Sequence, residues 1–163
     1  MRSSIGVEVA APPELLFELA RRVDRWAALL PHYLESRPLE RPAESVVIAR
    51  FVALRPIVPW LGLGVPVTWL SRTWSEPDVL RLRFQHLGGP TAGMDVTWRI
   101  DATADGCRVT IDHDFRPRLR PWALVIDRLA VRPIAGRTLA AFKAIAEAVV
   151  AAGAASATAG PGR

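Results

Sequence analysis

Apolar and polar residues alternate most regularly between residues 93 and 115. Side chains two residues apart lie on the same face of a strand, so residues 94–101 and 108–115 each predict a strand with one apolar and one charged face. The Asp-Gly pair at 105–106 separates them, and both residue types tolerate the positive φ angle of a tight hairpin turn. The pattern therefore predicts a β-hairpin whose apolar row contains one titratable ring, that of His113.

The rest of the chain divides into a strand, two short helices, a run of strands and a helical C-terminal part. Pro12 and Pro13 end the first strand and begin a helix that we expect to reach Arg22, since proline is tolerated in a first helical turn. Asp24 is the expected N-cap of a second helix, which Pro31 ends. Strands outside the hairpin are predicted at residues 5–9, 34–41, 46–54, 67–74 and 79–86.

Residues 55–66, RPIVPWLGLGVP, separate two of these strands. Three prolines and two glycines argue against a central strand through this stretch. Its apolar residues from Ile57 to Leu63 have two interpretations. They either fold over the core, or they form an exposed lid, a membrane-touching tip or a partner surface.

After Pro117 the apolar residues recur with the helical period of 3.6. They mark one segment at 122–129 and a longer helix at 134–149, and Pro133 between them either kinks one helix or begins a second. The residues from Gly153 on are small and polar. We therefore expect a single domain over residues 1–152 and a disordered tail over 153–163.

The order of these elements predicts the fold class. Consecutive strands with short connections favour an antiparallel sheet, and one long helix has to bury its apolar stripe on the concave face of that sheet. The prediction is an α+β fold: a curved antiparallel sheet of about six to seven strands wrapped on a long C-terminal helix, with two short helices after the first strand. This arrangement leaves a cavity between sheet and helix.

The composition is that of a folded globular protein, with 50% apolar residues among 163 and a net charge of +5. The arginines are scattered, so we expect no nucleic-acid partner. There is one cysteine, Cys107, and no Gly-rich phosphate loop, CxxC or HExxH motif, so neither a metal nor a cofactor is expected. No signal-peptide core or membrane-length apolar run is evident, so a cytoplasmic location is the expectation.

Three stretches carry a family resemblance: VAAPPELLFELARRVDRWAALLP, GPTAGMDVTWRI and VTIDHDF. They resemble the START-like (SRPBCC) superfamily of polyketide cyclase/dehydrase and lipid transport proteins, over residues 5–150. The resemblance implies a helix-grip fold with a deep apolar cavity. Within that group, Trp69-Leu70-Ser71, Met94 to Trp98 and Asp112 to Phe115 are most similar to three pocket strands of the type II polyketide aromatase/cyclases, which fold and dehydrate a tethered poly-β-ketone.

The same resemblance implies roles for particular residues. In some aromatase/cyclases the histidine at the position of His113 acts in proton transfer, and Tyr33 falls where several members place a pocket tyrosine. The family's pocket arginine follows the Trp-x-Ser motif by two residues, where this chain has Thr73. Arg72 has the opposite parity and should point outward. We therefore expect the group that stabilises an anion or enolate in the aromatase/cyclases to be missing from its usual position.

The candidate catalytic residues are His113, as acid and base, and Tyr33, which could hydrogen-bond a ketone oxygen. We expect the pKa of His113 to lie below the usual ~6.5, because burial disfavours imidazolium. Asp112 and Asp114 should face outward by parity, as partners of arginines. The alternative for His113 is a core histidine that bonds a backbone carbonyl.

The expected ligand-binding residues are those that parity places on the inner face of the strands or of the long helix. His86 could instead lie at the rim of the cavity, and the aromatic side chains and Met94 could equally pack in the core without lining a cavity. The set consists of Trp69, Ser71, Thr73, Leu82, Phe84, His86, Met94, Val96, Trp98, Ile111, Phe115 and Phe142.

Two functions fit these residues. The first is a cyclase/dehydrase that acts on a polyketide-like apolar substrate. The second is a carrier or chaperone without chemistry for a lipid or quinone-like molecule. The expected partners are an apolar small molecule, with a peripheral membrane surface or an acyl carrier protein as further contacts. His113 favours the enzyme and the absent arginine favours the carrier, while the sequence predicts neither the ligand nor the oligomeric state.

Overall fold

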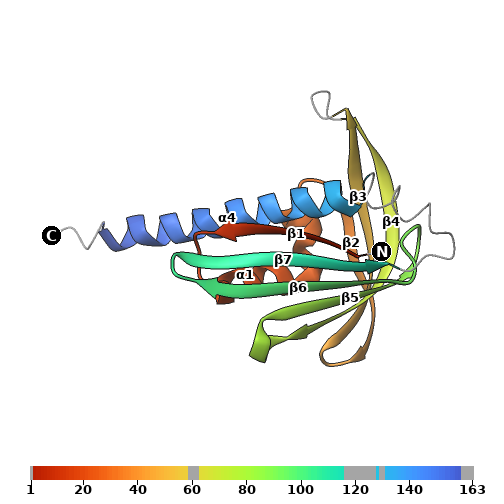
Figure 1. The fold of residues 1–163 in the computed structure, drawn as a ribbon, viewed down its shortest axis with the longest axis horizontal. Coiled ribbons are helices and arrows are strands. Elements are labelled where there is room, and N and C mark those ends of the chain that lie inside the picture. Colours follow the sequence, from red (N-terminus) through yellow and green to blue (C-terminus); the bar gives the residue numbers. More distant parts are fainter. Residues whose placement is uncertain (1, 59–62, 116–127, 129–130, 159–163) are drawn as a thin grey trace.

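A computed structural model of the chain describes residues 2–58, 63–115, 128 and 131–158 (Figure 1). Seven strands form one sheet, and helical segments stand between the first two strands, before β5 and at the C-terminal end. The strands are β1 (Arg2–Val9), β2 (Tyr33–Ala43), β3 (Val46–Val58), β4 (Leu63–Glu76), β5 (Arg81–Gly88), β6 (Met94–Thr103) and β7 (Gly106–Phe115). The helices are α1 (Pro13–Arg21), α2 (Trp26–Leu29) and α4 (Arg132–Thr158), with single 3₁₀ turns η1 (Val23–Arg25) and η3 (Pro77–Val79).

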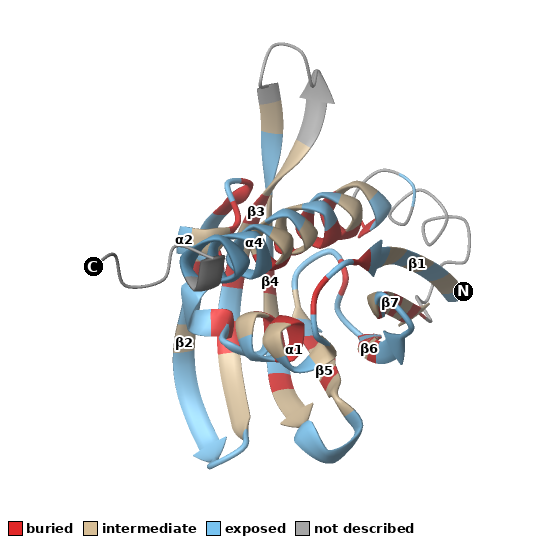
Figure 2. Cartoon of the chain, turned by 90° about the vertical axis from the view of Figure 1, so that its left-hand side faces the viewer, coloured by how far each residue is buried: buried red, intermediate tan, exposed pale blue. Residues whose placement is uncertain are grey.

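All neighbouring strands are antiparallel, in the order β1-β7-β6-β5-β4-β3-β2. Strands β2 to β7 each pair with the next strand in sequence, and β1 pairs with β7. The sheet is open, and it curves so that α4, α1 and α2 cover its inner face (Figures 1 and 2). This confirms the predicted α+β fold class, with its curved antiparallel sheet and long C-terminal helix.

The hairpin of β6 and β7 has the two faces that the sequence predicts. Met94, Val96, Trp98 and Ile100 are buried, and their neighbours along the strand are more exposed. β7 alternates in the same way. Gly106 has φ +150°, and a Cβ there would lie 2.2 Å from the Val9 carbonyl oxygen. Glycine is therefore required here by the close approach of β1 as well as by the hairpin turn.

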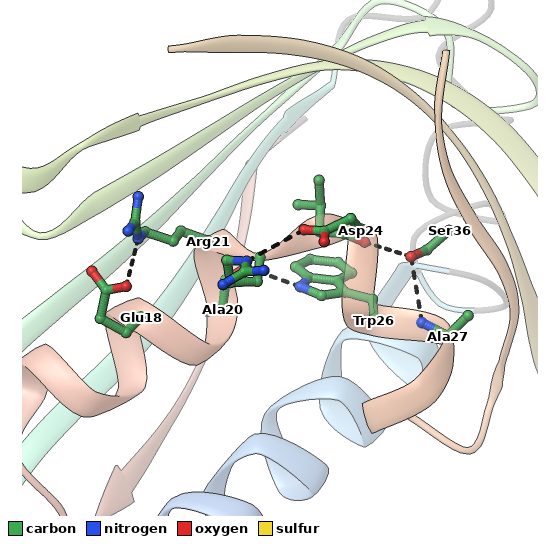
Figure 3. A network of polar contacts seen from close by, with 9 residues as sticks. Glu18, Ala20, Arg21, Asp24, Trp26, Ala27 and Ser36 are labelled. Carbon is green, nitrogen blue, oxygen red and sulfur yellow. Dashed lines mark hydrogen bonds and ion pairs between the residues drawn. The ribbon is translucent and has the colours of Figure 1, made fainter. Parts of the chain in front are cut away.

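The short helices after β1 are tied to each other and to β2 through polar contacts (Figure 3). The Trp26 Nε1–H donates to the Ala20 carbonyl at 2.9 Å. The Ser36 hydroxyl donates to the Val23 carbonyl and accepts from the Ala27 backbone N–H. The prediction of Asp24 as an N-cap is wrong: Asp24 lies inside η1 and pairs with an arginine, Arg22, at 3.6 Å.

The expectation that residues 55–66 interrupt the strands is also wrong for the described part of that stretch. β3 runs to Val58 and β4 begins at Leu63, with Pro56 opposite Gly64. β2 pairs with β3 only as far as Ala53, and β5 pairs with β4 only from Leu70. The hairpin thus projects beyond the sheet as a two-stranded ribbon (Figure 1), where a proline can face away from its single neighbour without removing a ladder hydrogen bond. The question of a lid or membrane tip concerns residues 59–62, which lie outside the described residues.

Pro133 is the second residue of α4, so it begins a helix and does not kink one. The preceding apolar segment at 122–129 lies outside the described residues, except for Arg128. α4 continues to Thr158, six residues beyond the predicted end of the domain at residue 152. Alanine, the residue with the highest helix propensity, recurs in this stretch and favours the continuation of the helix.

By length and composition, residues Arg132–Ser156 could cross a membrane, with a mean hydropathy of 1.5. The buried residues of this helix lie between Ile134 and Ala146, where it covers the sheet (Figure 2). A core helix of this kind has the same composition as a membrane span, so the finding does not place the protein in a membrane.

Trp26 lies at the centre of the core. It is 3% exposed, and its ring is surrounded by aromatic rings from the sheet and from α4. The centroid distances are 5.3 Å to Tyr33, 5.6 Å to Phe51, 5.6 Å to Phe84, 5.6 Å to Trp98 and 5.8 Å to Phe142. This single side chain from α2 thus connects four strands to the long helix.

We expect Trp26→Ala to lower the free energy of unfolding by about 3–5 kcal/mol, because it removes five ring contacts and leaves a void. Trp26→Phe should lower it less, through loss of the hydrogen bond to Ala20 and of part of the ring volume. Urea denaturation measures both values, with the half-exposed Val79→Ala as a control that should change stability by less than about 0.5 kcal/mol. A loss below about 1 kcal/mol in Trp26→Ala would contradict the central position of this ring.

Candidate functional site

A cavity lies between the inner face of the sheet and the first turns of α4. Its volume is about 80 Å³, enough for a few water molecules. Aromatic and aliphatic side chains form most of its wall, and five lining residues carry a hydroxyl group or an imidazole: Tyr33, His86, Thr91, His113 and Thr138. An apolar cavity with a few converging polar groups is typical of a small-molecule site.

Most of the predicted site residues line this cavity. They are Tyr33, Trp69, Phe84, His86, Met94, Val96, Trp98, Ile111 and His113. Five others are buried but do not line this cavity: Ser71, Thr73, Leu82, Phe115 and Phe142. For these five, strand or helix parity gave the correct buried face, but it could not tell a position at the cavity from one packed beside it.

His113 stands on β7 opposite Val96 and is 6% exposed. Its two acidic neighbours point away from the cavity, as predicted from the parity of the strand. Asp112 pairs with Arg99 at 2.9 Å and Asp114 with Arg2 at 3.4 Å, both on the outer face. His113 is therefore a titratable ring among apolar side chains, at the inner surface of a cavity that a ligand could enter.

His86 is a cavity residue and not a rim residue, with 9% of its surface exposed. Its ring stacks on Trp69, with 5.8 Å between centroids, and its Nδ1 lies 2.6 Å from the Thr91 hydroxyl oxygen. Burial lowers the pKa of His86 to about 3, and the nearby His113 acts in the same direction. His86 is therefore neutral at physiological pH.

A second polar group occurs where the chain enters β2. His32 Nε2 lies 2.9 Å from the Thr138 hydroxyl, which in turn donates to the Ile134 carbonyl of α4 at 2.9 Å. Since that hydroxyl proton is already used, His32 Nε2–H is the donor to Thr138. Burial lowers the pKa of His32 to about 4, and the positive charge of Arg137 adds to this effect, while a hydrogen bond to the Ile134 backbone opposes it.

Tyr33 lines the cavity beside this pair, with its ring 5.0 Å from that of the buried His32. Burial raises the pKa of its hydroxyl well above the usual value, and a hydrogen bond with Thr138 acts in the opposite direction. Tyr33 is therefore un-ionised and can serve as a hydrogen-bonding group. The predictions missed His32, Thr91 and Thr138, although Thr138 interrupts an otherwise apolar helical stripe.

Ser71 and Thr73 have structural hydrogen bonds. The Ser71 hydroxyl donates to the carbonyls of Arg72 and Gln85, and Thr73 donates to the Val47 carbonyl at 3.1 Å. Arg72 is exposed, as its parity predicts. Neither residue 72 nor residue 73 therefore presents a cation to the cavity.

Residues that could hold a metal ion are not grouped in the described part of the chain, where no three His, Cys, Asp or Glu side chains come together in a suitable arrangement. Cys107 is buried beside the hairpin turn, and burial raises the pKa of its thiol, with Glu8 and Glu14 adding to the effect. The chemistry that the cavity offers is that of imidazole, phenol and hydroxyl groups.

Comparison with known proteins identifies the family. The model of the family described as "Polyketide cyclase / dehydrase and lipid transport" matches residues 2–147. The chain belongs to this family. The predicted resemblance is thus confirmed over nearly the whole domain.

Individual relatives of this polyketide cyclase family member agree with that result. The chain is 34% identical over 140 residues to the actinorhodin polyketide synthase bifunctional cyclase/dehydratase of Streptomyces coelicolor, covering 84% of this chain but only 41% of that protein. Among solved structures, the Zhui aromatase/cyclase from Streptomyces sp. R1128 matches with a TM-score of 0.76 at 21% identity, covering 92% of this chain and 95% of that one. A START superfamily protein from Mycobacterium smegmatis matches with a TM-score of 0.69 at 16% identity, covering 91% and 98%. These two structures share the fold.

The neutral histidines predict how stability depends on pH. His32 and His86 have lowered pKa values in the folded protein and ordinary values near 6.5 in the unfolded chain, so the unfolded chain binds more protons in acid. The stabilisation of the folded state by these neutral histidines is complete above pH ~6.5 and is lost as the pH falls toward their pKa values in the folded protein. Between pH ~6 and ~5 we expect the free energy of unfolding to fall by up to about 1.4 kcal/mol per pH unit for each histidine.

Urea denaturation at several pH values in that window measures this slope, before carboxylates begin to titrate. His32→Gln should reduce the slope by about one proton, whatever its effect on absolute stability. An unchanged slope in that variant, or stability independent of pH in the native protein, would contradict the neutral buried state of His32.

Proposed function

We propose that this protein catalyses the cyclisation and dehydration of a poly-β-ketone, with His113 as acid and base. The observation that supports this most is the position of His113 at the inner surface of an apolar cavity, with its acidic neighbours turned to the outer face. Family membership and a cyclase/dehydratase among the relatives agree with the assignment. The chain spans about two-fifths of the length of that relative, so the reaction assigned here is a proposal for this chain alone.

The proposed reaction needs only proton transfers. Neutral His113 removes a proton from a methylene carbon between two carbonyls: the C–H bond breaks, its electron pair forms the enolate, and the ring becomes imidazolium. The enolate carbon attacks a second carbonyl carbon of the same chain, whose oxygen takes the proton back. His113 then removes a proton from the carbon beside the one that bears the new hydroxyl group and delivers it to that hydroxyl, whose C–O bond breaks. Water leaves, and the electron pair of the broken C–H bond forms a double bond in the ring.

Tyr33 is the proposed orienting group for this substrate. Its hydroxyl stays protonated, because burial raises its pKa, and the ring lines the cavity at the wall that α4 covers. A hydrogen bond from this phenol to a ketone oxygen, made in place of its bond to Thr138, would hold one end of the chain while the carbon beside it reaches His113. Positioning of this kind accounts for much of the rate enhancement in reactions within one bound molecule.

The cavity has to widen for such a substrate, because about 80 Å³ is less than a chain of several ketone units requires. Its wall consists largely of side chains that can change rotamer, which is a common response at binding sites.

The substrate is proposed to arrive bound to an acyl carrier protein. Arg132 and Arg137 are exposed in the first turns of α4, whose residues line the cavity, and Arg128 is exposed before this helix begins. These charges would attract a carrier protein with an acidic surface.

A carrier for an apolar molecule is the second candidate function. The observation in its favour is the absence of a cation at residue 73, where the aromatase/cyclases place their pocket arginine. A carrier needs the cavity and no turnover. Native mass spectrometry of the protein purified from its own host would detect a co-purified ligand in that case.

The two functions differ in the expected effect of His113→Gln. In an enzyme this variant should bind ligand with nearly unchanged affinity and lose turnover by the ~10²–10⁴-fold typical of a positioned acid/base. The measurement is the appearance of aromatic absorbance from a synthetic linear poly-β-ketone ester. Asp112→Asn on the outer face of the same strand is the matched control and should keep full turnover. Full turnover in folded His113→Gln would rule out the catalytic role.

A further inference from the structure

The pair formed by His86 and Thr91 is a feature that the proposed reaction has not yet used. His86 lies directly opposite Ser71 in the register of β4 and β5. It is therefore next to the strand segment from which the aromatase/cyclases project their arginine. The cavity wall at this point consists of the imidazole edge and the Thr91 side chain, which is 4% exposed.

The loop that carries Thr91 is held firmly by its own backbone. Gly93 N–H donates to the His86 carbonyl at 2.8 Å, and Met94 N–H donates to the Thr91 carbonyl at 3.0 Å. Gly89 has φ +87°, and a Cβ there would lie 2.3 Å from the Thr68 carbonyl oxygen, so the loop packs directly on β4. These contacts fix the position of the Thr91 hydroxyl relative to the His86 ring.

The direction of the hydrogen bond follows from the proton of the Thr91 hydroxyl. The 2.6 Å contact with His86 Nδ1 is the one hydrogen bond that this buried hydroxyl makes to residues described by the structure. A buried donor left unsatisfied destabilises the fold by about 1–3 kcal/mol, so Thr91 donates and Nδ1 accepts. In a neutral imidazole the ring proton is then on Nε2.

This tautomer presents an N–H donor to the ligand. His86 lines the cavity, and its Nε2 makes no hydrogen bond to the described residues. The Nδ1 lone pair of this ring accepts the bond from Thr91 and Nε2 already carries a proton, so His86 does not compete with His113 for the substrate proton. A neutral imidazole in a dry site is a suitable donor to an oxygen on which negative charge develops.

We propose that His86 Nε2–H donates a hydrogen bond to the enolate oxygen of the bound substrate, taking the place of the arginine that residue 73 lacks, and that Thr91 is the positioning residue that selects this tautomer. The inference rests on the proposed function for the identity of the substrate. No proton leaves His86 in this step. The α-proton goes to His113, the electron pair moves onto the carbonyl oxygen, and that oxygen accepts the Nε2–H bond until the new carbon–carbon bond forms.

The tautomer is tested directly by nitrogen NMR of the imidazole rings in the full chain. The expected result for the native protein is a protonated Nε2 and an unprotonated Nδ1 on His86. Thr91→Ser keeps the hydroxyl and should preserve this pattern. Thr91→Val, which has nearly the same shape, should give a mixture of tautomers, and protonation of Nδ1 in the native protein would overturn the proposal.

The donor is tested with 4-nitrophenol, a one-ring probe whose phenolate form absorbs visible light and resembles an enolate. The measurement is the pKa of the bound probe in each protein. We expect this pKa to rise by about one unit in His86→Phe, a tenfold loss of preference for the anion. It should rise by a smaller amount in Thr91→Val, where part of the rings still carry the Nε2 proton, and remain unchanged in Thr91→Ser. Nitrobenzene, which lacks the oxygen, should bind all four proteins equally.

An unchanged pKa of bound 4-nitrophenol in Thr91→Val and His86→Phe would overturn the proposal. Neither the probe nor the NMR measurement depends on turnover. A native protein that shifts the probe but does not cyclise a poly-β-ketone would therefore refute the proposed function and leave the donor assignment in place. A protein that cyclises a poly-β-ketone but does not change the pKa of bound 4-nitrophenol would refute the donor assignment and leave the proposed function in place.

Discussion

Removal of the concave face of the sheet from water is the constraint on which the rest of this structure depends. The strands alternate apolar and polar residues, so one face of the sheet has to be covered, and α4 and the short helices cover it. Trp26 fills the middle of the enclosed space and touches rings from both layers. What remains unfilled is the cavity, and every polar group that faces it is forced into a low-dielectric environment.

That environment determines the chemical state of the polar groups. Burial lowers the pKa values of His32 and His86 and raises that of Tyr33, so each is held in its neutral form. A neutral ring can act as a base or as a hydrogen-bond donor, and its partners decide which. Thr138 accepts a hydrogen bond from His32, and Thr91 donates one to His86. His113 is the ring placed for proton transfer in the proposed reaction. Under the two proposals, a cavity whose described lining residues include no arginine or lysine supplies both a base and an anion-stabilising donor.

Much of the fold could be predicted, because the period of two along the strands and the period of 3.6 in the C-terminal part are direct consequences of backbone geometry. His113 was recognisable as a polar ring in an apolar row. Parity could not show which inward residues reach the cavity, so Ser71, Thr73 and Phe142 were assigned to it and are buried without lining it. His32 and Thr91 lie in connections, where no period applies, and their roles depend on contacts between distant segments. The prolines of the β3–β4 ribbon were misinterpreted because their effect depends on how many neighbours a strand has.

Proton transfer by His113 is the central claim, and hydrogen–deuterium exchange at the acidic carbon of a small ketone tests it most directly. An α-methylated β-keto ester has one such hydrogen, and NMR in D₂O follows its replacement without any need for cyclisation. The account predicts that the native protein accelerates this exchange, and that His113→Gln loses ~10²-fold or more of the acceleration while binding the ester equally well. Equal exchange rates with the native protein and with folded His113→Gln would contradict it.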